Sequence, residues 1–377
     1  MKNPGFPAPE RLPLRRGWPD PLEMFRGERV ATRAAWEHVR KPELGALFRH
    51  YMYGFEPPAP RNLRVRLLDE MPHARGRAVL REYRVNFGPR GTPAMSLLIV
   101  RPARVRGPVP MFVGVNFTGN VNVRSGMDGR PDAWPAELVV RKGFGFATFH
   151  ASDVDPDRPD FTDGVHPWYF RRGQTKPRPT DWGTISAWAW GLSRAADALL
   201  RARETAPDRL MAIGHSRMGK AALLAAALDP RFALAIVNQA GCGGSAPSRG
   251  TVGESVRSIN KMFPHWFNDV FPRFSRAVNR LPFDQHGLVA LVAPRPVLFL
   301  AAEGDQWANP DGQFEVLKHA EPVYHLLGAK GLGVNRRPPI GKLVGADLGY
   351  RLRPGTHALG PDDWAVALRF ASARLKV

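Results

Sequence analysis

Residues 210–220 read L-M-A-I-G-H-S-R-M-G-K, and they are the clearest indication of the fold in the chain. An apolar, strand-like run enters a turn of small residues, and an Ala-rich segment suited to a helix continues to Leu228. A tight turn between a strand and a helix holds a serine hydroxyl above the edge of a sheet, near backbone N–H groups that can receive a negative oxygen. The stretch therefore predicts a nucleophile elbow, with Ser216 as the nucleophile.

The spacing of this turn departs from the strict elbow pattern, G-x-S-x-G. Here Gly214, Ser216 and Gly219 give G-x-S-x-x-G. A bare G-x-S match is weak evidence, because serine is also an ordinary N-cap of a helix. The strand before the turn and the helix after it favour the nucleophile over the cap.

Strand-like and helix-like segments alternate around the elbow. Residues 144–150 and 296–302 resemble strands, whereas residues 184–202 and 362–375 resemble helices. Alternation of this kind predicts a mostly parallel sheet with helices on both faces. The expected fold is the α/β-hydrolase fold, a three-layer sandwich.

The start of the chain follows a different pattern. Strand-like runs at 79–87, 95–100 and 109–117 have no helices between them, so antiparallel strands are expected to begin the sheet. We expect residues 1–31 to form an extended arm and residues 32–377 to form a single catalytic domain.

Composition excludes several classes of protein. No apolar run approaches the roughly 18 to 20 residues that span a bilayer. The single cysteine, Cys242, excludes an intramolecular disulfide framework and a Cys-based zinc cluster. Basic residues near the N-terminus have no apolar segment behind them, so no intact secretory signal is expected. Either the protein is cytoplasmic, or the sequence begins after a removed leader.

The net charge of +20 is high. Arginine is spread along the whole chain beside abundant Ala, Pro and Gly, which indicates a compositional bias more than a binding patch. Attraction to an acidic polymer is the alternative. Nucleic acid is not expected, because no recognisable nucleic-acid-binding module accompanies the charge. Acidic polysaccharide stays open as a partner.

The order nucleophile, acid, histidine selects the other catalytic residues. His357 lies in the Gly-containing stretch R-P-G-T-H-A just before the last helix, and is the predicted base. Asp305 ends the stretch P-V-L-F-L-A-A-E-G-D, a buried strand followed by a turn, and is the predicted acid. Glu303 is its near rival. The histidines set aside, because they precede the acid or lie in helical or apolar segments, are His265, His286, His319 and His325.

Several short motifs together resemble the glucuronoyl esterases of carbohydrate esterase family 15, and the bacterial branch most. They are G-H-S-R-M-G-K at 214–220, Q-A-G-C-G-G at 239–244, G-E-S at 253–255, D-Q-W at 305–307, A-W-A-W-G-L-S-R at 187–194, F-P-H-W-F at 263–267 and A-P-R-P at 293–296. The similarity extends from about Trp36 to the C-terminus.

The resemblance implies a serine esterase that acts without a metal or organic cofactor. Members of this family cleave the ester between glucuronic acid on xylan and alcohols of lignin. The implied substrate is therefore an ester of (4-O-methyl-)glucuronic acid on glucuronoxylan, and the implied location is extracellular or periplasmic. We expect a monomer and no membrane partner.

The resemblance also assigns roles to residues near the elbow. Arg217 would supply a cationic contact to the oxyanion, whereas Lys220, Glu254 and Trp307 would contact the hydroxyls and face of the glucuronate ring, with Trp266 close by. Each has a plainer interpretation as well. Arg217 and Lys220 could be solvated helix residues, Glu254 a surface charge and Trp307 part of the core.

One position departs from the family pattern. Some members carry a glutamate as the triad acid 23 residues after the serine, where this chain has Gln239. A glutamine cannot stabilise an imidazolium as an anion does, so the acid is expected to be Asp305. Gln239 is expected to donate a hydrogen bond nearby.

Two further features of the sequence are less specific. The acidic run D-V-D-P-D-R-P-D at 153–160 is interpreted as a loop, because Arg158 and Gly164 stand where a calcium-binding EF-hand loop needs Gly and Glu. The stretch 116–120, N-F-T-G-N, follows a strand where many hydrolases place a second oxyanion donor.

Two other classes of function stay open. The first is a different α/β-hydrolase, such as an acetyl-xylan-type esterase or a peptidase. The second is a non-catalytic carbohydrate-binding relative, against which the presence of Ser216, Asp305 and His357 argues.

Overall fold

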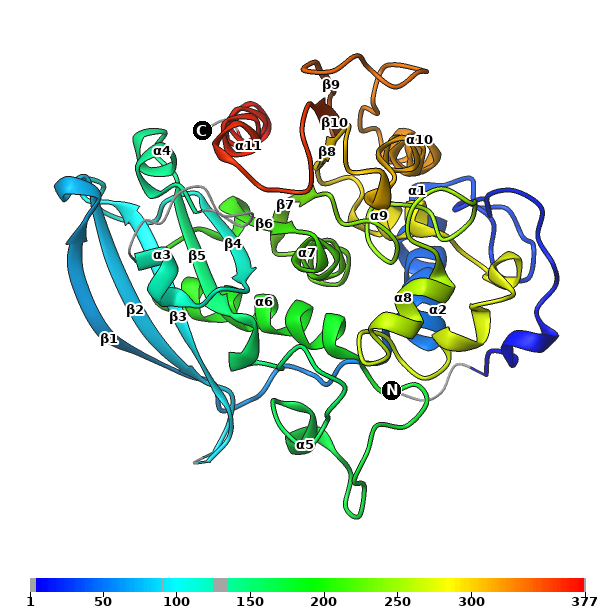
Figure 1. Ribbon diagram of the computed structural model, residues 1–377, viewed down its shortest axis with the longest axis horizontal. Helices are drawn as coiled ribbons and strands as arrows, with labels where there is room; N and C mark the ends of the chain where they lie inside the picture. The colour runs from blue at the N-terminus through cyan, green and yellow to red at the C-terminus, as the bar shows by residue number, and fades with distance from the viewer. Residues whose placement is uncertain (1–4, 90, 125–133, 376–377) are drawn as a thin grey trace.

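A computed structural model describes residues 5–89, 91–124 and 134–375. Within these residues the chain forms one ten-stranded sheet in the order β1-β2-β3-β5-β4-β6-β7-β8-β10-β9, with helices on both faces (Figure 1). The strands are β1 (Arg64–His73), β2 (Ala78–Asn86), β3 (Ala94–Pro102), β4 (Met111–Asn116), β5 (Gly145–His150), β6 (Leu210–His215), β7 (Phe232–Asn238), β8 (Val297–Ala302), β9 (Leu343–Gly345) and β10 (Leu348–Arg353).

Neighbouring strands are antiparallel at both ends of the sheet and parallel between them. β1, β2 and β3 pair antiparallel, and β3 is also antiparallel to β5. From β5 to β10 every neighbour is parallel, and β9 returns antiparallel at the far edge. The mostly parallel sheet and its antiparallel beginning are therefore confirmed.

Helices cover both faces of this sheet. α6 and α7 lie on one face together with α9 and α10, whereas α4 and α11 lie on the other (Figure 1). The helices among the described residues are α1 (Arg33–Ala35), α2 (Lys41–Phe48), α3 (Asn120–Arg124), α4 (Ala136–Arg141), α5 (His166–Tyr169), α6 (Thr184–Arg201), α7 (Arg217–Leu228), α8 (Val256–Met262), α9 (Gln285–Val292), α10 (Pro310–Leu326) and α11 (Pro361–Leu375). None of them is long and apolar enough to cross a membrane.

The central strands are apolar throughout because both faces are buried. In β6, Leu210 and Ala212 join the core beneath α6 and α7, whereas Met211 and Ile213 join the core beneath α4 and α11. All four side chains are at most 1% exposed. Consecutive residues of a strand point to opposite faces, so a strand buried on both sides shows no polar alternation.

β1 has no counterpart in the sequence-based prediction. Its sequence, R-V-R-L-L-D-E-M-P-H, carries charges on both faces, and most of its side chains are exposed or half-buried. Charged side chains on an edge strand discourage it from pairing with other chains. The same charges interrupt the apolar pattern by which a strand is predicted from sequence.

The N-terminal segment packs against the helices on the α2 and α9 side. Leu12 is 1% exposed, the hydroxyl of Tyr51 donates to the carbonyl of Pro7 at 2.8 Å, and a ring nitrogen of His286 lies 2.7 Å from the carbonyl of Pro19. The dark blue trace in Figure 1 follows this course along one end of the molecule. His286 therefore has a partner in the N-terminal segment, away from the predicted triad.

The layer between α11 and the sheet depends on Trp364. Its ring is fully buried, with ring centroids 5.4 Å from Phe112 and 5.6 Å from Trp134. We expect Trp364→Ala to lower the free energy of unfolding by about 3–5 kcal/mol, as large-to-small core substitutions do. Urea denaturation measures this change. Arg369→Ala, at an exposed position of the same helix, should change it by less than about 0.5 kcal/mol, and an equal loss in both variants would contradict the packing account.

Candidate active site

Ser216 lies in a sharp turn between β6 and α7. Its backbone has φ +56° and ψ −127°, a conformation that residues with side chains rarely adopt. Gly214 allows the turn, since a Cβ atom at this position would lie 2.2 Å from the carbonyl oxygen of Met218. The turn therefore requires glycine before the serine, and it lifts the serine side chain to the end of the sheet.

The departure from the strict elbow pattern has a structural explanation. Met218 stands where the second glycine would be, and its side chain is buried. The close approach of helix to sheet occurs one residue later, at Gly219, where a Cβ atom would lie 3.0 Å from the carbonyl oxygen of Gly214 and 3.1 Å from the Cβ of Ala240. The shifted glycine thus still permits the close packing of α7.

His357 and Asp305 meet at the same end of the sheet. The Nδ1 atom of His357 lies 2.6 Å from the Oδ2 atom of Asp305. Asp305 follows β8 and His357 follows β10, and these parallel strands are neighbours, so their carboxyl ends bring the two loops together. The side chain of Asp305 is 5% exposed and that of His357 is 42% exposed. The carboxylate is therefore sheltered, while the imidazole reaches the site.

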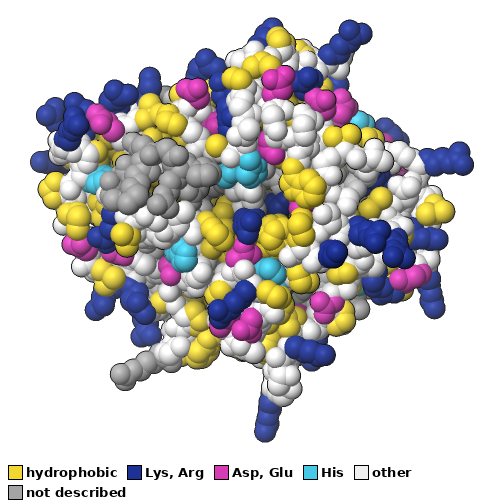
Figure 2. Space-filling view, in the orientation of Figure 1, with side chains coloured by type: hydrophobic (Ala, Val, Ile, Leu, Met, Phe, Trp, Pro, Cys, Tyr) yellow, Lys and Arg dark blue, Asp and Glu magenta, His cyan; other side chains and the backbone are white. Residues whose placement is uncertain are grey.

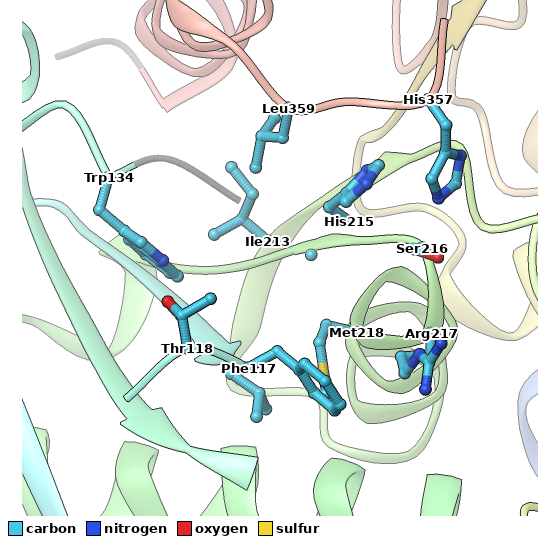
Figure 3. Close-up of a pocket in the computed structure, with 12 residues that line it drawn as sticks. Phe117, Thr118, Trp134, Ile213, His215, Ser216, Arg217, Met218, His357 and Leu359 are labelled. Atoms are coloured by element: carbon cyan, nitrogen blue, oxygen red, sulfur yellow. The ribbon is translucent and has the colours of Figure 1, made fainter. Parts of the chain in front are cut away.

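Figure 3 shows the imidazole of His357 on one side of Ser216 and the side chain of Arg217 on the other. An Nδ1–carboxylate contact fixes the tautomer in which Nε2 accepts a proton, as a general base requires. The structure therefore brings together Ser216, His357 and Asp305, in the arrangement of a nucleophile, a base and an orienting acid.

Two polar residues hold the loop that carries His357. Gln239 is buried, with φ +48°, and its Oε1 accepts a hydrogen bond from the backbone N–H of Ala358 at 3.0 Å. The expectation that Gln239 donates is therefore replaced by an accepting contact to the residue after the base. His215 packs on His357 with ring centroids 4.4 Å apart. Burial and the charge of His357 lower the pKa of His215 to about 3, so His215 stays neutral and does not compete for the proton.

The alternative acid, Glu303, and the histidines set aside as bases are exposed or contact residues other than Asp305 and His357. Glu303 is exposed, and its backbone pairs with Arg353. His319 lies in α10 and stacks on Trp18 with ring centroids 4.2 Å apart, whereas His325 is exposed on the same helix. His265 points to Asp157 at 2.8 Å.

The residues that the family resemblance assigns to the sugar, Lys220, Glu254 and Trp307, lie next to one another and form a wall beside α7. Lys220 is buried, and its ammonium group donates to the carbonyls of Ala240 and Cys242 at 2.6 and 2.5 Å. It also lies 3.7 Å from the carboxylate of Glu254. Burial lowers the pKa of Lys220, and the Glu254 charge opposes that change. Lys220 and Glu254 are therefore a sheltered pair, which excludes the interpretations as a solvated lysine and a surface charge.

Trp307 and Trp266 differ in exposure. Trp307 is 54% exposed, which excludes the core interpretation, and its carbonyl accepts from the backbone N–H of Glu254 at 2.9 Å. Trp266 is 3% exposed, stacks on Phe263 with ring centroids 3.7 Å apart, and donates from Nε1 to Asp157 at 2.7 Å. An exposed indole face suits a sugar ring, so Trp307 can provide the platform while Trp266 supports the wall.

The other side of Ser216 is apolar. A cavity of about 280 Å³ opens beside it (Figure 3). Its lining residues are Val115, Phe117, Thr118, Trp134, Ile213, Gly214, His215, Ser216, Arg217, Met218, His357 and Leu359. The stretch 116–120 thus contributes to the rim, as expected. The cavity itself is absent from the sequence-based account, because its walls come from four separate segments.

The face that carries the site has mixed charges. Figure 2 shows Lys and Arg side chains spread over this face with Asp and Glu among them, and histidines near a central hollow. Within the described part of the chain, no group of three or more His, Cys, Asp or Glu side chains could hold a metal ion. In the acidic run, the carboxylate of Asp155 faces His166 at 3.2 Å and that of Asp157 accepts from His265 and Trp266.

Several known proteins are similar to this chain in sequence. A model of the family described as "Glucuronyl esterase, fungi" matches residues 95–328, more than half of the chain. A protein named carbohydrate esterase MZ0003, from an unknown prokaryotic organism, is 38% identical over 94% of this chain and 88% of its own length. The 4-O-methyl-glucuronoyl methylesterase of Podospora anserina is 27% identical, over 86% of this chain and 63% of its own length.

Solved structures of esterases from the same family are similar to this chain in fold. The glucuronoyl esterase from Solibacter usitatus superposes with a TM-score of 0.89 at 34% identity, covering 97% of this chain and 99% of that chain. A promiscuous esterase of carbohydrate esterase family 15, from a marine bacterial metagenome, superposes with a TM-score of 0.86 at 37% identity, covering 98% and 100%. The α/β-hydrolase fold is thereby confirmed.

The contact between Asp305 and His357 generates a prediction. Asp305→Asn keeps the size of the side chain but removes the charge that stabilises the imidazolium and selects its tautomer. We expect kcat to fall by roughly 10²–10⁴-fold with KM little changed, by analogy with the loss of the orienting aspartate in serine proteases. Steady-state kinetics on an ester substrate measure both constants. Glu303→Gln is the matched control, and a larger loss in that variant would reassign the acid.

Proposed function

The chain belongs to the glucuronoyl esterases, carbohydrate esterase family 15, and on this premise we propose that it hydrolyses esters of 4-O-methyl-glucuronic acid on glucuronoxylan. The observation that carries the proposal is the contact between Asp305 and His357, in a site whose cavity His357 lines together with Ser216. Lys220, one helical turn after Ser216, lies close to Glu254.

The proposed reaction has two steps. His357 takes the proton of the Ser216 hydroxyl, and the serine oxygen attacks the C6 ester carbonyl. The guanidinium of Arg217 and its backbone N–H stabilise the oxyanion. The bond to the alcohol then breaks, and the alcohol leaves with the proton from His357. Water repeats the sequence on the glucuronoyl-enzyme, which returns the serine hydroxyl and releases the free acid.

The two sides of Ser216 suggest how the substrate is divided. The wall of Lys220, Glu254 and Trp307 offers charged groups and an exposed aromatic face, which suit a uronate ring. The cavity beside Phe117 and Trp134 is lined mainly by apolar side chains, which suit the alcohol of an aromatic ester. We assign the acyl part to the first side and the alcohol to the second.

We also propose a domain organisation, an oligomeric state and a location for the protein. We treat residues 32–377 as one catalytic domain and residues 1–31 as an arm over it, and we propose a monomer that acts outside the cytoplasm. A polymeric glucuronoxylan substrate supports the last point, because such a polymer lies outside the cell that degrades it.

The test compares three esters. We expect the benzyl and methyl esters of glucuronic acid to be hydrolysed, with kcat/KM higher for the benzyl ester because its ring buries apolar surface in the cavity. Ser216→Ala should abolish both activities. Hydrolysis of an acetyl ester alone would keep a serine esterase but contradict the uronate assignment, and no turnover of any ester would favour a carbohydrate-binding relative.

A further inference from the structure

Asp157 is a sheltered carboxylate beside the catalytic turn, and the proposed reaction gives it no part. It lies in the loop after β5, within the acidic run 153–160. Its Oδ1 accepts hydrogen bonds from Nε2 of His265 at 2.8 Å and from Nε1 of Trp266 at 2.7 Å. Its Oδ2 accepts from Nη1 of Arg217, the residue that follows the nucleophile. Each carboxylate oxygen therefore has its own partners.

The carboxylate is held in its charged form. Its side chain is 9% exposed, and this burial opposes ionisation. Hydrogen bonds from His265, Trp266 and Arg217 and the charge of Arg217 outweigh burial and lower the pKa of Asp157 below its ordinary value. Asp157 is therefore an anion at neutral pH. The rings of His265 and Trp266 hold one of its oxygens, and the other oxygen binds the guanidinium of Arg217.

Three aromatic rings surround the guanidinium of Arg217. Its central carbon lies 5.1 Å from the ring centroid of Phe117, 5.2 Å from that of Phe263 and 4.9 Å from that of Trp266. Contacts of this kind between a cation and aromatic faces are favourable. An unrestrained arginine has many rotamers, and ordering it costs side-chain entropy. Here the rings and Asp157 restrain the group before any substrate arrives.

Neighbouring acidic residues of the same run do other work. Asp153 accepts from the backbone N–H of Ser96, Asp155 pairs with His166, and Asp160 accepts from Thr162. These contacts hold the loop itself. Asp157 instead links the loop to the residue beside Ser216.

We propose that Asp157 is a positioning residue for the reaction, holding the Arg217 guanidinium where the oxyanion forms. The inference rests on the proposed function. A donor aimed in advance at a developing charge needs no reorganisation during the reaction, which is why such donors are effective. Because the carboxylate also offsets part of the positive charge of Arg217, its contribution must come from orientation. A purely electrostatic role for Arg217 would instead be enhanced by removing Asp157.

The test uses the full chain and a benzyl ester of glucuronic acid. Five variants are compared with the wild type: Asp157→Asn, Asp157→Glu, Arg217→Ala, the double variant of Asp157→Asn with Arg217→Ala, and Asp160→Asn as a matched control in the same loop. In Asp157→Asn the amide oxygen can still accept from His265 and Trp266, so the substitution acts mainly on the contact to Arg217. kcat, KM and the melting temperature are measured for each.

We expect Asp157→Asn to lower kcat by roughly 10–100-fold, less than the roughly 10²–10³-fold cost of losing an oxyanion donor outright. KM should stay within about threefold, because an oxyanion contact is made only in the transition state. Adding Asp157→Asn to Arg217→Ala should cost less than about twofold more, and Asp160→Asn should match the wild type. Asp157→Glu, which keeps the charge on a longer stem, should lower kcat with the melting temperature retained.

Three outcomes would overturn the inference. A kcat for Asp157→Asn equal to or above that of the wild type would show that Arg217 needs no anchor. A change confined to KM would place Asp157 in substrate binding. Full additivity with Arg217→Ala would mean that the two residues act separately. The proposed function is tested separately, by wild-type turnover of the glucuronate ester and its loss in Ser216→Ala. The role of Asp157 is tested by the ratio of kcat in the variant to kcat in the wild type, on whichever ester the wild type cleaves.

Discussion

The backbone conformation of Ser216 is the constraint on which the rest of the site depends. A residue with a side chain at φ +56° and ψ −127° costs of order 1–3 kcal/mol, and it persists only where the surroundings enforce it. β6 and α7 do so, because Gly214 lets the chain reverse against Met218 while Gly219 lets the helix approach the sheet. The hydroxyl then stands at the carboxyl end of the sheet. Everything else that acts on the substrate is arranged around that point.

The parallel order of strands supplies the remaining parts of the triad. β6, β7, β8 and β10 run side by side in the same direction, so the segments that follow them share one edge of the sheet. Gln239 after β7, Asp305 after β8 and His357 after β10 meet there, although 118 positions separate the first from the last. Ligands of open α/β sheets bind at this edge for the same reason.

This topology explains how much could be predicted from the sequence. The α/β fold, the antiparallel beginning of the sheet and the grouping of Ser216, Asp305 and His357 follow from local patterns combined with a fixed order along the chain. Contacts between loops do not follow from such patterns. Asp157 lies in an acidic run that looks like a solvated loop, and nothing local indicates that it reaches Arg217. β1 was missed because its charged edge lacks apolar alternation.

The burial of Lys220 could not be predicted from the sequence either. A lysine one helical turn after the nucleophile could be solvated or buried, and the sequence fits both. In the fold its ammonium group is tied to two carbonyls and lies close to Glu254, since a buried charge is tolerated only with such partners. Family resemblance identified the residue, and the packing explains why the position accepts a cation.

The proposed mechanism requires Ser216 to be a nucleophile activated by His357. A phosphonylating reagent that reacts with activated serines tests it directly, when the intact protein and its peptides are weighed by mass spectrometry. We expect one adduct, on the peptide that contains Ser216, with labelling abolished in Ser216→Ala and strongly slowed in His357→Ala. An adduct on another serine, or labelling at the wild-type rate in His357→Ala, would contradict it.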